Sequence, residues 1–587
     1  MEKSQRVLLV LVLGFLSSAG LQAQVRRAPT AKRPETKAVL RDAPSKGVPS
    51  AGALGQRIDA ILADPALSSS QVGVSVTTIE GKPLYEHNDG RLFVPASNVK
   101  LITTAAAYGL LPVETLSWTT SVAAAGEIDS AGVLHGNLVL LGVGDPTLSI
   151  RPYPYKPPPP PGSAPAPAPA TNAAENGVPA VPKPVDPMLP LDLLAQQVQQ
   201  DGVRSVEGDI IGDDSFFLDQ SYGQNWSWGD LQWDYGAPVS ALTFNDNVVF
   251  VNVLPGEHPG DKAVVTVEPE TNYYELDNRV VTSSAGVPKR VGIHRDPGSK
   301  TIVLWGSLPP GDSGMKEPMS IEDPAEFVAQ LFRIMLERRG ITIRGKTRAR
   351  HGDAEQFFDQ QILHPMIPPA AGTAASSIVN PSASASTPAQ PEQPDLNQSP
   401  NKVLAEHFSG PLLDDVRVTN KVSENLHAEL ALRLAGKLRG YGGSFEGGVA
   451  AVKQFLLQAG LKEDEFTFLD GSGLSRRDLV TPAATVQLLI YAARQPWGPA
   501  FEESLPVSGV DGSLSERFQK TPASGLIQAK TGSLSHVNAL SGYGQTQAGK
   551  RFVFSIFCNN HNLPASKVLA AMDAVVKLLV GDEPRKK

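Results

Sequence analysis

The segment Ser97-Asn98-Val99-Lys100 opens a stretch, residues 97–110, that combines a helical pattern with two reactive side chains. Small or apolar residues recur along it at a helical period, at Val99, Ile102, Ala106 and Leu110. Residues three apart on a helix share a face, so we expect Lys100 to lie beside the Ser97 hydroxyl. A serine hydroxyl is a weak nucleophile at neutral pH and needs a base within hydrogen-bond reach. The stretch therefore predicts a nucleophilic serine with a lysine as its base.

Two later peptides, Ser423-Glu424-Asn425 and Lys530-Thr531-Gly532, supply the remaining parts of an acyl-transfer site. They offer a second hydroxyl, an amide and a second cation, which can relay protons, orient groups and bind an anionic substrate. The three peptides in this order predict a serine acyl-enzyme.

The same Ser-x-x-Lys spacing also occurs at Ser313–Lys316 and at Ser399–Lys402. A Pro-Pro-Gly-Asp turn precedes Ser313, and Pro400 disfavours a helix across Ser399. Neither place is expected to orient its lysine toward its serine.

The chain resembles the low-molecular-mass class C penicillin-binding proteins, a family of D-alanyl-D-alanine carboxypeptidases and endopeptidases that includes penicillin-binding protein 4. Beyond the three peptides, the resemblance rests on four further segments that span nearly the whole chain. They are Gly142-Val143-Gly144-Asp145-Pro146-Thr147-Leu148, Tyr235-Gly236-Ala237-Pro238, Asp470-Gly471-Ser472-Gly473-Leu474-Ser475 and Gly509-Val510-Asp511-Gly512-Ser513-Leu514. Glu424 and Ser533 stand where relatives often carry other small or polar residues, which leaves substrate preference open.

Chemistry and resemblance together assign the expected roles. Ser97 attacks the carbonyl of the penultimate D-alanine, and Lys100, desolvated and near a cationic Lys530, is its base. Ser423 relays a proton to the leaving amine, and Asn425 orients Lys100 and the substrate amide. The remaining roles concern binding: the backbone N–H groups of Ser97 and Ser533 form the oxyanion hole, Lys530 and Thr531 hold the terminal carboxylate, and Gly532 lets the substrate backbone approach.

The two ends of the chain predict one α/β (α+β) domain, with an antiparallel sheet flanked by helices, like the serine β-lactamases and transpeptidases. The expected strands are Gln71–Thr78, Pro83–His87, Leu526–Lys530, Val537–Tyr543 and Arg551–Cys558, and Ala565–Leu579 is an expected helix. A helix over Asn420–Leu434 would place Ser423 and Asn425 at its start, and Lys530–Gly532 would end an edge strand.

Residues 52–118 and 406–582 are the expected halves of this catalytic domain, and 119–405 are an expected insertion, mainly β. The resemblance implies that the insertion consists of nested domains, a second domain interrupted by a third. Within the insertion, Val264–Val281 and Lys300–Trp305 alternate as strands, and Glu322–Arg339 is helical in pattern. Two Pro-rich segments, 152–190 and 365–400, are predicted to be disordered, solvent-exposed and without a catalytic role. Deletion of Tyr153–Lys183 is therefore expected to leave fold and activity nearly unchanged.

The amino terminus predicts export to the periplasm of the cell envelope. Lys3 and Arg6 precede an apolar run, and residues 1–23 are expected to be a signal peptide followed by a flexible tether, 24–51. We expect no transmembrane helix in the mature chain. The formal net charge is −8 and the signal segment carries +1, so the mature chain is near −9 and a nucleic-acid partner is not expected. The lone Cys558 predicts a buried, inert thiol.

No cofactor is expected, and none of the ten histidines makes a helical metal pair. His536 and His561 are expected to be satisfied or solvated rather than catalytic, and Asp470–Ser475 and Gly509–Ser513 to be structural turns around the cleft. The expected partners are peptidoglycan peptides, with β-lactam antibiotics as covalent inhibitors. Two alternatives stay open: a β-lactamase or esterase of the same serine-lysine class, and a noncatalytic peptidoglycan-binding protein. The balance between carboxypeptidase and endopeptidase action is not decided by the sequence.

Overall fold

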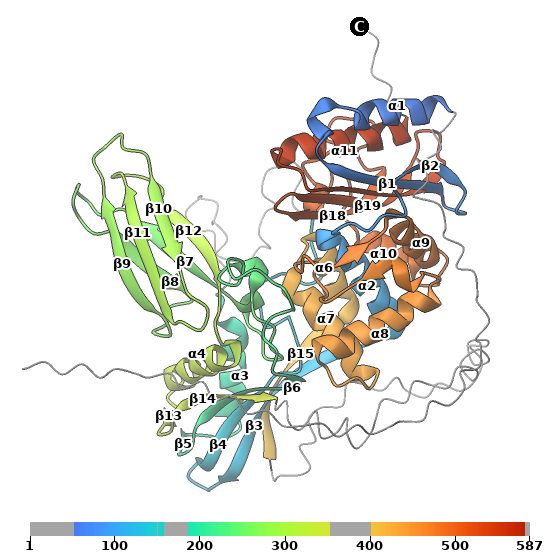
Figure 1. Ribbon diagram of the computed structural model, residues 1–587. Helices are drawn as coiled ribbons and strands as arrows, with labels where there is room; N and C mark the ends of the chain where they lie inside the picture. Colours follow the sequence, from blue (N-terminus) through green and yellow to red (C-terminus); the bar gives the residue numbers. More distant parts are fainter. Residues whose placement is uncertain (1–51, 150, 158–185, 353–400, 582–587) are drawn as a thin grey trace, which may run out of the picture. The chain divides into compact units, whose positions relative to one another are not determined.

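The computed structural model of the chain describes residues 52–149, 151–157, 186–352 and 401–581 (Figure 1). The predicted signal peptide, the predicted tether up to residue 51, and the Pro-rich segment 365–400 lie outside the described residues. Among the described helices, none is both long enough and apolar enough to cross a membrane.

A five-stranded sheet joins strands from the two ends of the chain. Its order is β18-β19-β20-β1-β2, and every neighbouring pair is antiparallel. The strands are β1 (Gln71–Thr78), β2 (Pro83–His87), β18 (Ile527–Leu534), β19 (Val537–Gln545) and β20 (Arg551–Asn559). All five strands were predicted, and the antiparallel sheet is confirmed. β18 lies at the edge as expected, but it continues to Leu534, so Lys530–Gly532 lies within the strand rather than at its end.

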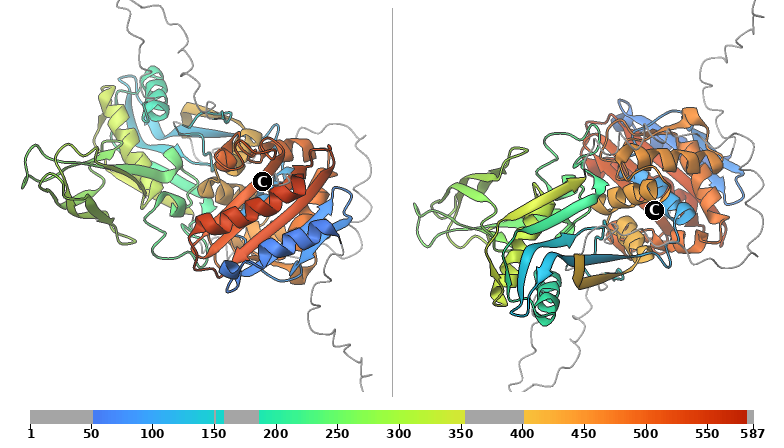
Figure 2. Two further views of the ribbon diagram at one scale, coloured as in Figure 1. Left: turned by 90° about the horizontal axis from the view of Figure 1, so that it is seen from above. Right: turned by 90° about the horizontal axis from the view of Figure 1, so that it is seen from below.

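The central strand β20 shows why this sheet has two buried faces. Phe552, Phe554, Ile556 and Cys558 face one hydrophobic cluster, and Val553 and Phe557 face another, as the two-residue period of a strand requires. Helices α1 (Ala53–Leu62) and α11 (Ala565–Val580) cover the first face and lie against one another (Figure 2). The buried thiol of Cys558 is confirmed, and burial raises its pKa to about 11.

A group of helices covers the other face and carries most of the predicted motifs (Figure 1). α2 (Val99–Leu110) is almost completely buried, which explains its run of small and apolar residues. Around it lie α6 (Leu412–Lys421), α7 (Asn425–Leu438), α8 (Phe445–Gln458), α9 (Pro482–Ala493) and α10 (Gly498–Ser504), with the short strands β16 (Phe466–Thr467) and β17 (Leu479–Val480).

The prediction of one helix over Asn420–Leu434 is wrong. α6 ends at Lys421, and α7 begins at Asn425. Between them Ser423 has a left-handed backbone with φ of 65°, a conformation that a continuing helix cannot contain. The Glu424 side chain accepts a hydrogen bond from the Asn425 N–H and so caps the new helix. The break leaves Ser423 in a short connection between two helices.

The middle of the chain forms a second, seven-stranded sheet with two helices against it. Its strands are β3 (Ser117–Ile128), β4 (Val133–Leu141), β5 (Ser205–Val206), β6 (Ile210–Leu218), β13 (Thr342–Ile343), β14 (Thr347–Gly352) and β15 (Asn401–Pro411). The helices are α3 (Leu189–Gln200) and α4 (Pro324–Arg338), of which α4 was predicted. β15 pairs with β3, so the chain returns from the middle region beside the strand by which it left.

Two three-stranded sheets complete the middle region, in the orders β12-β7-β8 and β10-β11-β9. Their strands are β7 (Val248–Leu254), β8 (Val264–Glu268), β9 (Glu275–Thr282), β10 (Arg290–His294), β11 (Thr301–Leu308) and β12 (Met315–Ser320). The alternation predicted over Val264–Val281 is split between β8 and β9. The mainly-β character of this region is confirmed.

The first Pro-rich segment begins and ends differently from the prediction. Residues 152–157 and 186–190 are described, and the latter include the first residues of α3. Tyr153 and Tyr155 are only partly exposed, and the Tyr155 hydroxyl accepts a hydrogen bond from the Gly512 N–H at 3.1 Å. The prediction that the whole segment is exposed to solvent is therefore wrong at its start, because these aromatic rings pack on the protein. The domain boundaries at 118 and 406 remain predictions, and they fall inside β3 and β15.

Candidate active site

Ser97 lies in a single 3-10 turn, Ala96–Asn98, immediately before α2, and is partly exposed. Its neighbour Ala96 has a left-handed φ of 49°. Gly473 packs against the Ala96 carbonyl so closely that a Cβ there would lie 1.9 Å from the oxygen. The turn is thus fixed by close backbone packing, and it presents the hydroxyl at the start of a helix, as the sequence predicted.

Lys100 is completely buried, and its ammonium nitrogen contacts three oxygens. Nζ lies 3.1 Å from Ser97 Oγ, 2.5 Å from Asn425 Oδ1 and 2.7 Å from the Ser472 carbonyl oxygen. A neutral amine has two N–H donors and one lone pair. The amide oxygen and the carbonyl can only accept, so they take the two N–H bonds and the lone pair faces the Ser97 hydroxyl. The geometry suits removal of the Ser97 proton.

Burial lowers the pKa of Lys100 to about 8, although Glu429, Asp470 and Glu424 act in the opposite direction. Desolvation of Lys100 was predicted and is the main cause of the shift. The predicted cationic state of Lys530 is not supported, because Lys530 is itself completely buried and burial places its pKa well below the ordinary value, with the charge of Lys100 adding to the effect. Two buried amines at one site favour a neutral base.

Lys530 and Ser423 form the second contact between distant motifs. Lys530 Nζ donates to Ser423 Oγ at 2.7 Å and to the Thr531 carbonyl at 2.9 Å. Asn98, inside the first motif, donates from Nδ2 to the Lys530 carbonyl at 3.1 Å. The structure therefore brings Ser97, Lys100, Ser423, Asn425 and Lys530 into one connected group.

The three residues after Lys530 make different contacts. The Thr531 hydroxyl is 2.7 Å from the Ser513 hydroxyl, and the exposed Ser533 accepts from Asn538 Nδ2 at 3.1 Å. A Cβ at Gly532 would lie 2.7 Å from the Pro95 carbonyl oxygen. Gly532 is thus needed for packing against the chain's own backbone, which differs from its predicted role toward a substrate.

Two contacts of the site come from backbone carbonyls, whose role a residue type does not reveal, although both carbonyls lie in segments that carry the resemblance. The Ser472 carbonyl that contacts Lys100 is a backbone group, as is the Tyr235 carbonyl that accepts from Asn425 Nδ2 at 2.7 Å. The turn Asp470–Ser475 therefore contributes directly to the site, beyond the structural role expected for it. The Tyr235 contact links Asn425 to the middle region of the chain.

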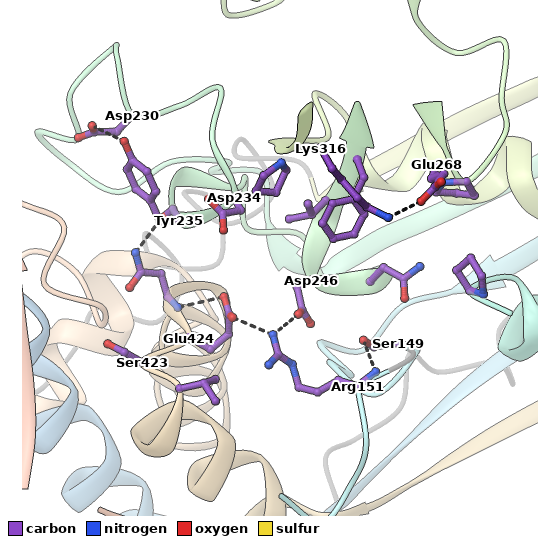
Figure 3. Close-up of a pocket in the computed structure, with 18 of the residues that line it drawn as sticks. Ser149, Arg151, Asp230, Asp234, Tyr235, Asp246, Glu268, Lys316, Ser423 and Glu424 are labelled. Atoms are coloured by element: carbon purple, nitrogen blue, oxygen red, sulfur yellow. Dashed lines mark hydrogen bonds and ion pairs between the residues drawn. The ribbon is translucent and has the colours of Figure 1, made fainter. Parts of the chain in front are cut away.

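Arg151 makes a further link between the middle region and the second motif (Figure 3). It donates to Glu424 Oε2 at 2.9 Å and also to the Asp246 carboxylate. Asp246 in turn lies 3.1 Å from Nε2 of the buried His427 on α7. These contacts hold the short connection that contains Ser423.

A pocket of about 1310 Å³ extends from Ser97 into the middle region. Its catalytic end is lined by Ser97, Ser423, Asn425, Gly473, Leu474 and residues 533–535, and its far end by Phe250, Glu268, Lys316 and Arg338. This volume exceeds that of most small-molecule pockets, about 300–1,000 Å³. An extended substrate fits it better than a single amino acid does.

The other motif matches lie away from the catalytic group. Lys316 belongs to β12 and pairs with Glu268 at 2.6 Å, so no helix orients it toward Ser313, as predicted. Lys402 belongs to β15, and Ser399 lies outside the described residues. His536 Nδ1 lies 2.7 Å from the His561 carbonyl oxygen, and neither ring is among the described residues that line the pocket.

Comparisons with known proteins agree over most of the chain. A family model described as the D-Ala-D-Ala carboxypeptidase 3 (S13) family matches residues 54–358 and 390–580. A D-alanyl-D-alanine carboxypeptidase of Actinomadura sp. is 33% identical over 534 residues, which cover 89% of this chain and 83% of that protein. The D-alanyl-D-alanine carboxypeptidase DacB of Haemophilus influenzae is 23% identical over 499 residues, covering 84% of this chain and 86% of that one.

A solved structure is similar over the same extent. The crystal structure of penicillin binding protein 4 from Haemophilus influenzae matches with a TM-score of 0.67 and 21% sequence identity, covering 89% of this chain and 98% of that chain. At this identity the match supports the fold.

Proposed function

Because the chain belongs to the D-Ala-D-Ala carboxypeptidase 3 (S13) family, we propose that its carboxypeptidase reaction proceeds at Ser97 through an acyl-enzyme. The chain is a serine-type D-alanyl-D-alanine carboxypeptidase, and its substrate class is the peptidoglycan stem peptide. The observation that carries the residue assignment is the position of Lys100 Nζ, held by Asn425 and Ser472 and directed at Ser97 Oγ.

In the first half of the proposed reaction, neutral Lys100 takes the Ser97 proton while Ser97 Oγ attacks the carbonyl of the penultimate D-alanine. The backbone N–H groups of Ser97 and Ser533 stabilise the oxyanion. The peptide C–N bond then breaks, and the leaving amine of the terminal D-alanine takes up a proton.

Ser423 is positioned to deliver that proton. Its Oγ already accepts a hydrogen bond from Lys530, so its own O–H is free to point toward the leaving amine. Lys100 then passes the Ser97 proton on to the Ser423 oxygen, which restores both the neutral base and the Ser423 hydroxyl. In the second half, Lys100 takes a proton from the water that attacks the ester and returns it to Ser97 Oγ as the Ser97 C–O bond breaks. The shortened peptide leaves as an acid that ionises to its carboxylate.

Binding of the terminal carboxylate falls to Lys530 and Thr531. A bound carboxylate favours the charged form of Lys530, which burial alone disfavours. The Thr531 hydroxyl, next to Ser513, offers a second donor. β-Lactams, which carry a comparable carboxylate beside a reactive amide, are proposed to acylate the same serine.

Cross-linked peptides are the second candidate substrates. The pocket continues well beyond the space that a terminal D-alanine needs, toward Phe250 and Lys316. An endopeptidase reaction would break the same kind of bond with a larger leaving group. We place the protein in the periplasm on the evidence of its apolar amino-terminal segment.

Two measurements test this proposal. Benzylpenicillin is incubated with the protein and the adduct is located by peptide mass mapping, with Ser97 as the expected site. Monomeric and cross-linked muropeptides containing diaminopimelate are then digested, and the products are weighed. An adduct on another serine would contradict the nucleophile, and rapid penicillin turnover without an adduct would favour a β-lactamase.

A further inference from the structure

Glu429 is a completely buried carboxylate, and the reaction described above assigns it no role. It lies on α7 one turn after Asn425, on the same helix face. Its two oxygens accept hydrogen bonds from two successive backbone groups, the Gly471 N–H at 2.8 Å and the Ser472 N–H at 2.8 Å. A carboxylate with both oxygens engaged in this way holds a peptide segment in one place.

The segment that Glu429 holds is the one that contacts the general base. The Ser472 carbonyl accepts from Lys100 Nζ at 2.7 Å. From the other side, the Thr103 hydroxyl donates to the Gly471 carbonyl at 2.7 Å. The Gly471–Ser472 backbone is therefore fixed by Glu429 at its N–H groups and by α2 at its carbonyls.

We propose that Glu429 is a positioning residue for the general base Lys100. Through the Ser472 carbonyl it fixes one of the two acceptors that leave the lysine lone pair facing Ser97, and the other acceptor is Asn425 on the same helix face. Its negative charge also acts on Lys100 directly. This inference rests on the proposed role of Lys100 in acylation.

Several charged groups lie around Lys100 and Glu429 and influence their pKa values. Asp470, in the same turn, accepts from the Gly473 and Ser475 N–H groups, and Asp478 lies beside it. Arg433 follows Glu429 by one turn of α7, and Lys530 faces Lys100 from β18. Burial raises the pKa of Glu429 to about 8 and Asp470 adds to the rise, whereas the two backbone N–H groups oppose it. Glu429 is therefore only partly charged near pH 8, and its charged form raises the pKa of Lys100.

The test measures the rate of benzylpenicillin acylation between pH 5 and 10 for the full chain and three variants. Glu429→Gln removes the charge, so the pKa of Lys100 falls and the acid limb of the profile moves down by up to about one pH unit, with a lower plateau, because Glu429 is itself only partly charged near pH 8. Glu429→Asp keeps the carboxylate but shortens the side chain. The acid limb of the pH profile is therefore expected to stay in place, and the plateau rate of acylation is expected to fall. Glu446→Gln, which removes a carboxylate bound by Gln220 and Gln224, is the matched control and keeps the parent profile.

A fourth variant keeps the test decisive where Glu429 variants fold poorly. Thr103→Val is nearly isosteric and releases the same turn from α2 without changing any charge. Its plateau is expected to fall and its acid limb to stay. A parent-like limb in folded Glu429→Gln, or parent-like plateaus in both Glu429→Asp and Thr103→Val, would overturn the proposal. Failure of the parent protein to form the Ser97 adduct would instead contradict the proposed function.

Discussion

Lys530 and Ser423, 107 residues apart, are joined by a hydrogen bond of 2.7 Å from Nζ to Oγ. The bond connects an edge strand of the five-stranded sheet with the short connection between α6 and α7. Because Ser423 Oγ accepts this bond, its own hydroxyl proton points elsewhere. Each lysine of the site thus contacts a different serine: Lys100 contacts Ser97, and Lys530 contacts Ser423.

Lys100→Ala is expected to reduce the rate of penicillin acylation by a factor on the order of 10² to 10⁴, because the base is lost. Stopped-flow or quench measurements of adduct formation give this rate. Lys402→Ala, at the unrelated Ser-x-x-Lys match, removes an exposed lysine paired with Asp201 and serves as control. An unchanged rate in Lys100→Ala would show that Lys100 is not the base and would make Ser423 the next candidate for that role.

Lys530→Gln is expected to lose less acylation rate than Lys100→Ala and more than Thr531→Ser. The glutamine removes the charge for the substrate carboxylate and changes the contact with Ser423. The serine keeps a hydroxyl near Ser513. The comparison uses a peptide substrate and its C-terminal amide, and the Lys530→Gln loss should largely disappear with the amide. An equal loss with both peptides would argue against carboxylate binding.

Arg151→Ala is expected to destabilise the fold, because it leaves the Asp246 and Glu424 carboxylates close together without their cation. Removal of one partner from such a partly buried group costs about 3 kcal/mol in the free energy of unfolding. Arg279→Ala, which breaks an exposed pair with Asp277, should change the free energy of unfolding far less, because solvent screens this pair. Urea unfolding of both variants provides the comparison. Similar losses would mean that the Arg151 group does not support the Ser423 connection.

Gly473→Ala is expected to disturb both stability and acylation. Its φ is +84°, and the added Cβ would meet the Ala96 carbonyl next to Ser97. Gly340→Ala has a similar φ of +80° with open space around it, so it should show only the cost of the left-handed backbone, about 1–2 kcal/mol. Thermal unfolding and acylation rates separate the two effects. A Gly473→Ala variant that matches Gly340→Ala in both would contradict the close packing of the Ser97 turn.

Replacement of residues 158–183 by a Gly-Ser linker is expected to leave thermal stability and activity nearly unchanged, because their composition offers few apolar side chains. Replacement of residues 153–183 should lower the melting temperature by several degrees. The longer change also removes Tyr155, whose hydroxyl accepts from the Gly512 N–H, and the partly buried Tyr153. If the two replacements melt at the same temperature, these tyrosine contacts contribute little.

Much of the catalytic group is visible in the sequence, because Ser97, Lys100, Ser423, Asn425 and Lys530 use side chains whose chemistry shows in their residue type. The Ser472 and Tyr235 carbonyls are not visible, since every residue has a carbonyl and only the fold aims it. Nor does the sequence pattern reveal Glu429, because it stands within a helical pattern where a glutamate is ordinary and its partners come 42 and 43 residues later.

Some elements of the secondary structure can likewise be predicted from the sequence, and others cannot. Strands such as β1 and β20 are predicted within one or two residues, because β-branched and aromatic residues suited to a strand fill the buried positions on both faces of their sheet. The break between α6 and α7 is not predicted, since the apolar period continues across Ser423 and only its left-handed backbone interrupts the helix. Tyr153 and Tyr155 were likewise assigned to a solvent-exposed segment because proline dominates their neighbourhood.

The pairing of β1 with β20 imposes an order on the biosynthesis of the active protein. Strand β1 is among the first parts of the chain to be made, yet one of its two neighbours, β20, is among the last. The contacts of the first motif are also completed late, because Asn98 donates to the Lys530 carbonyl, which lies 432 residues further along the chain. A ribosome-bound chain that ends before β18 therefore holds Ser97 and Lys100 without their completed surroundings. The proposed reaction at Ser97 is therefore expected only from a chain whose synthesis has passed β18 to β20.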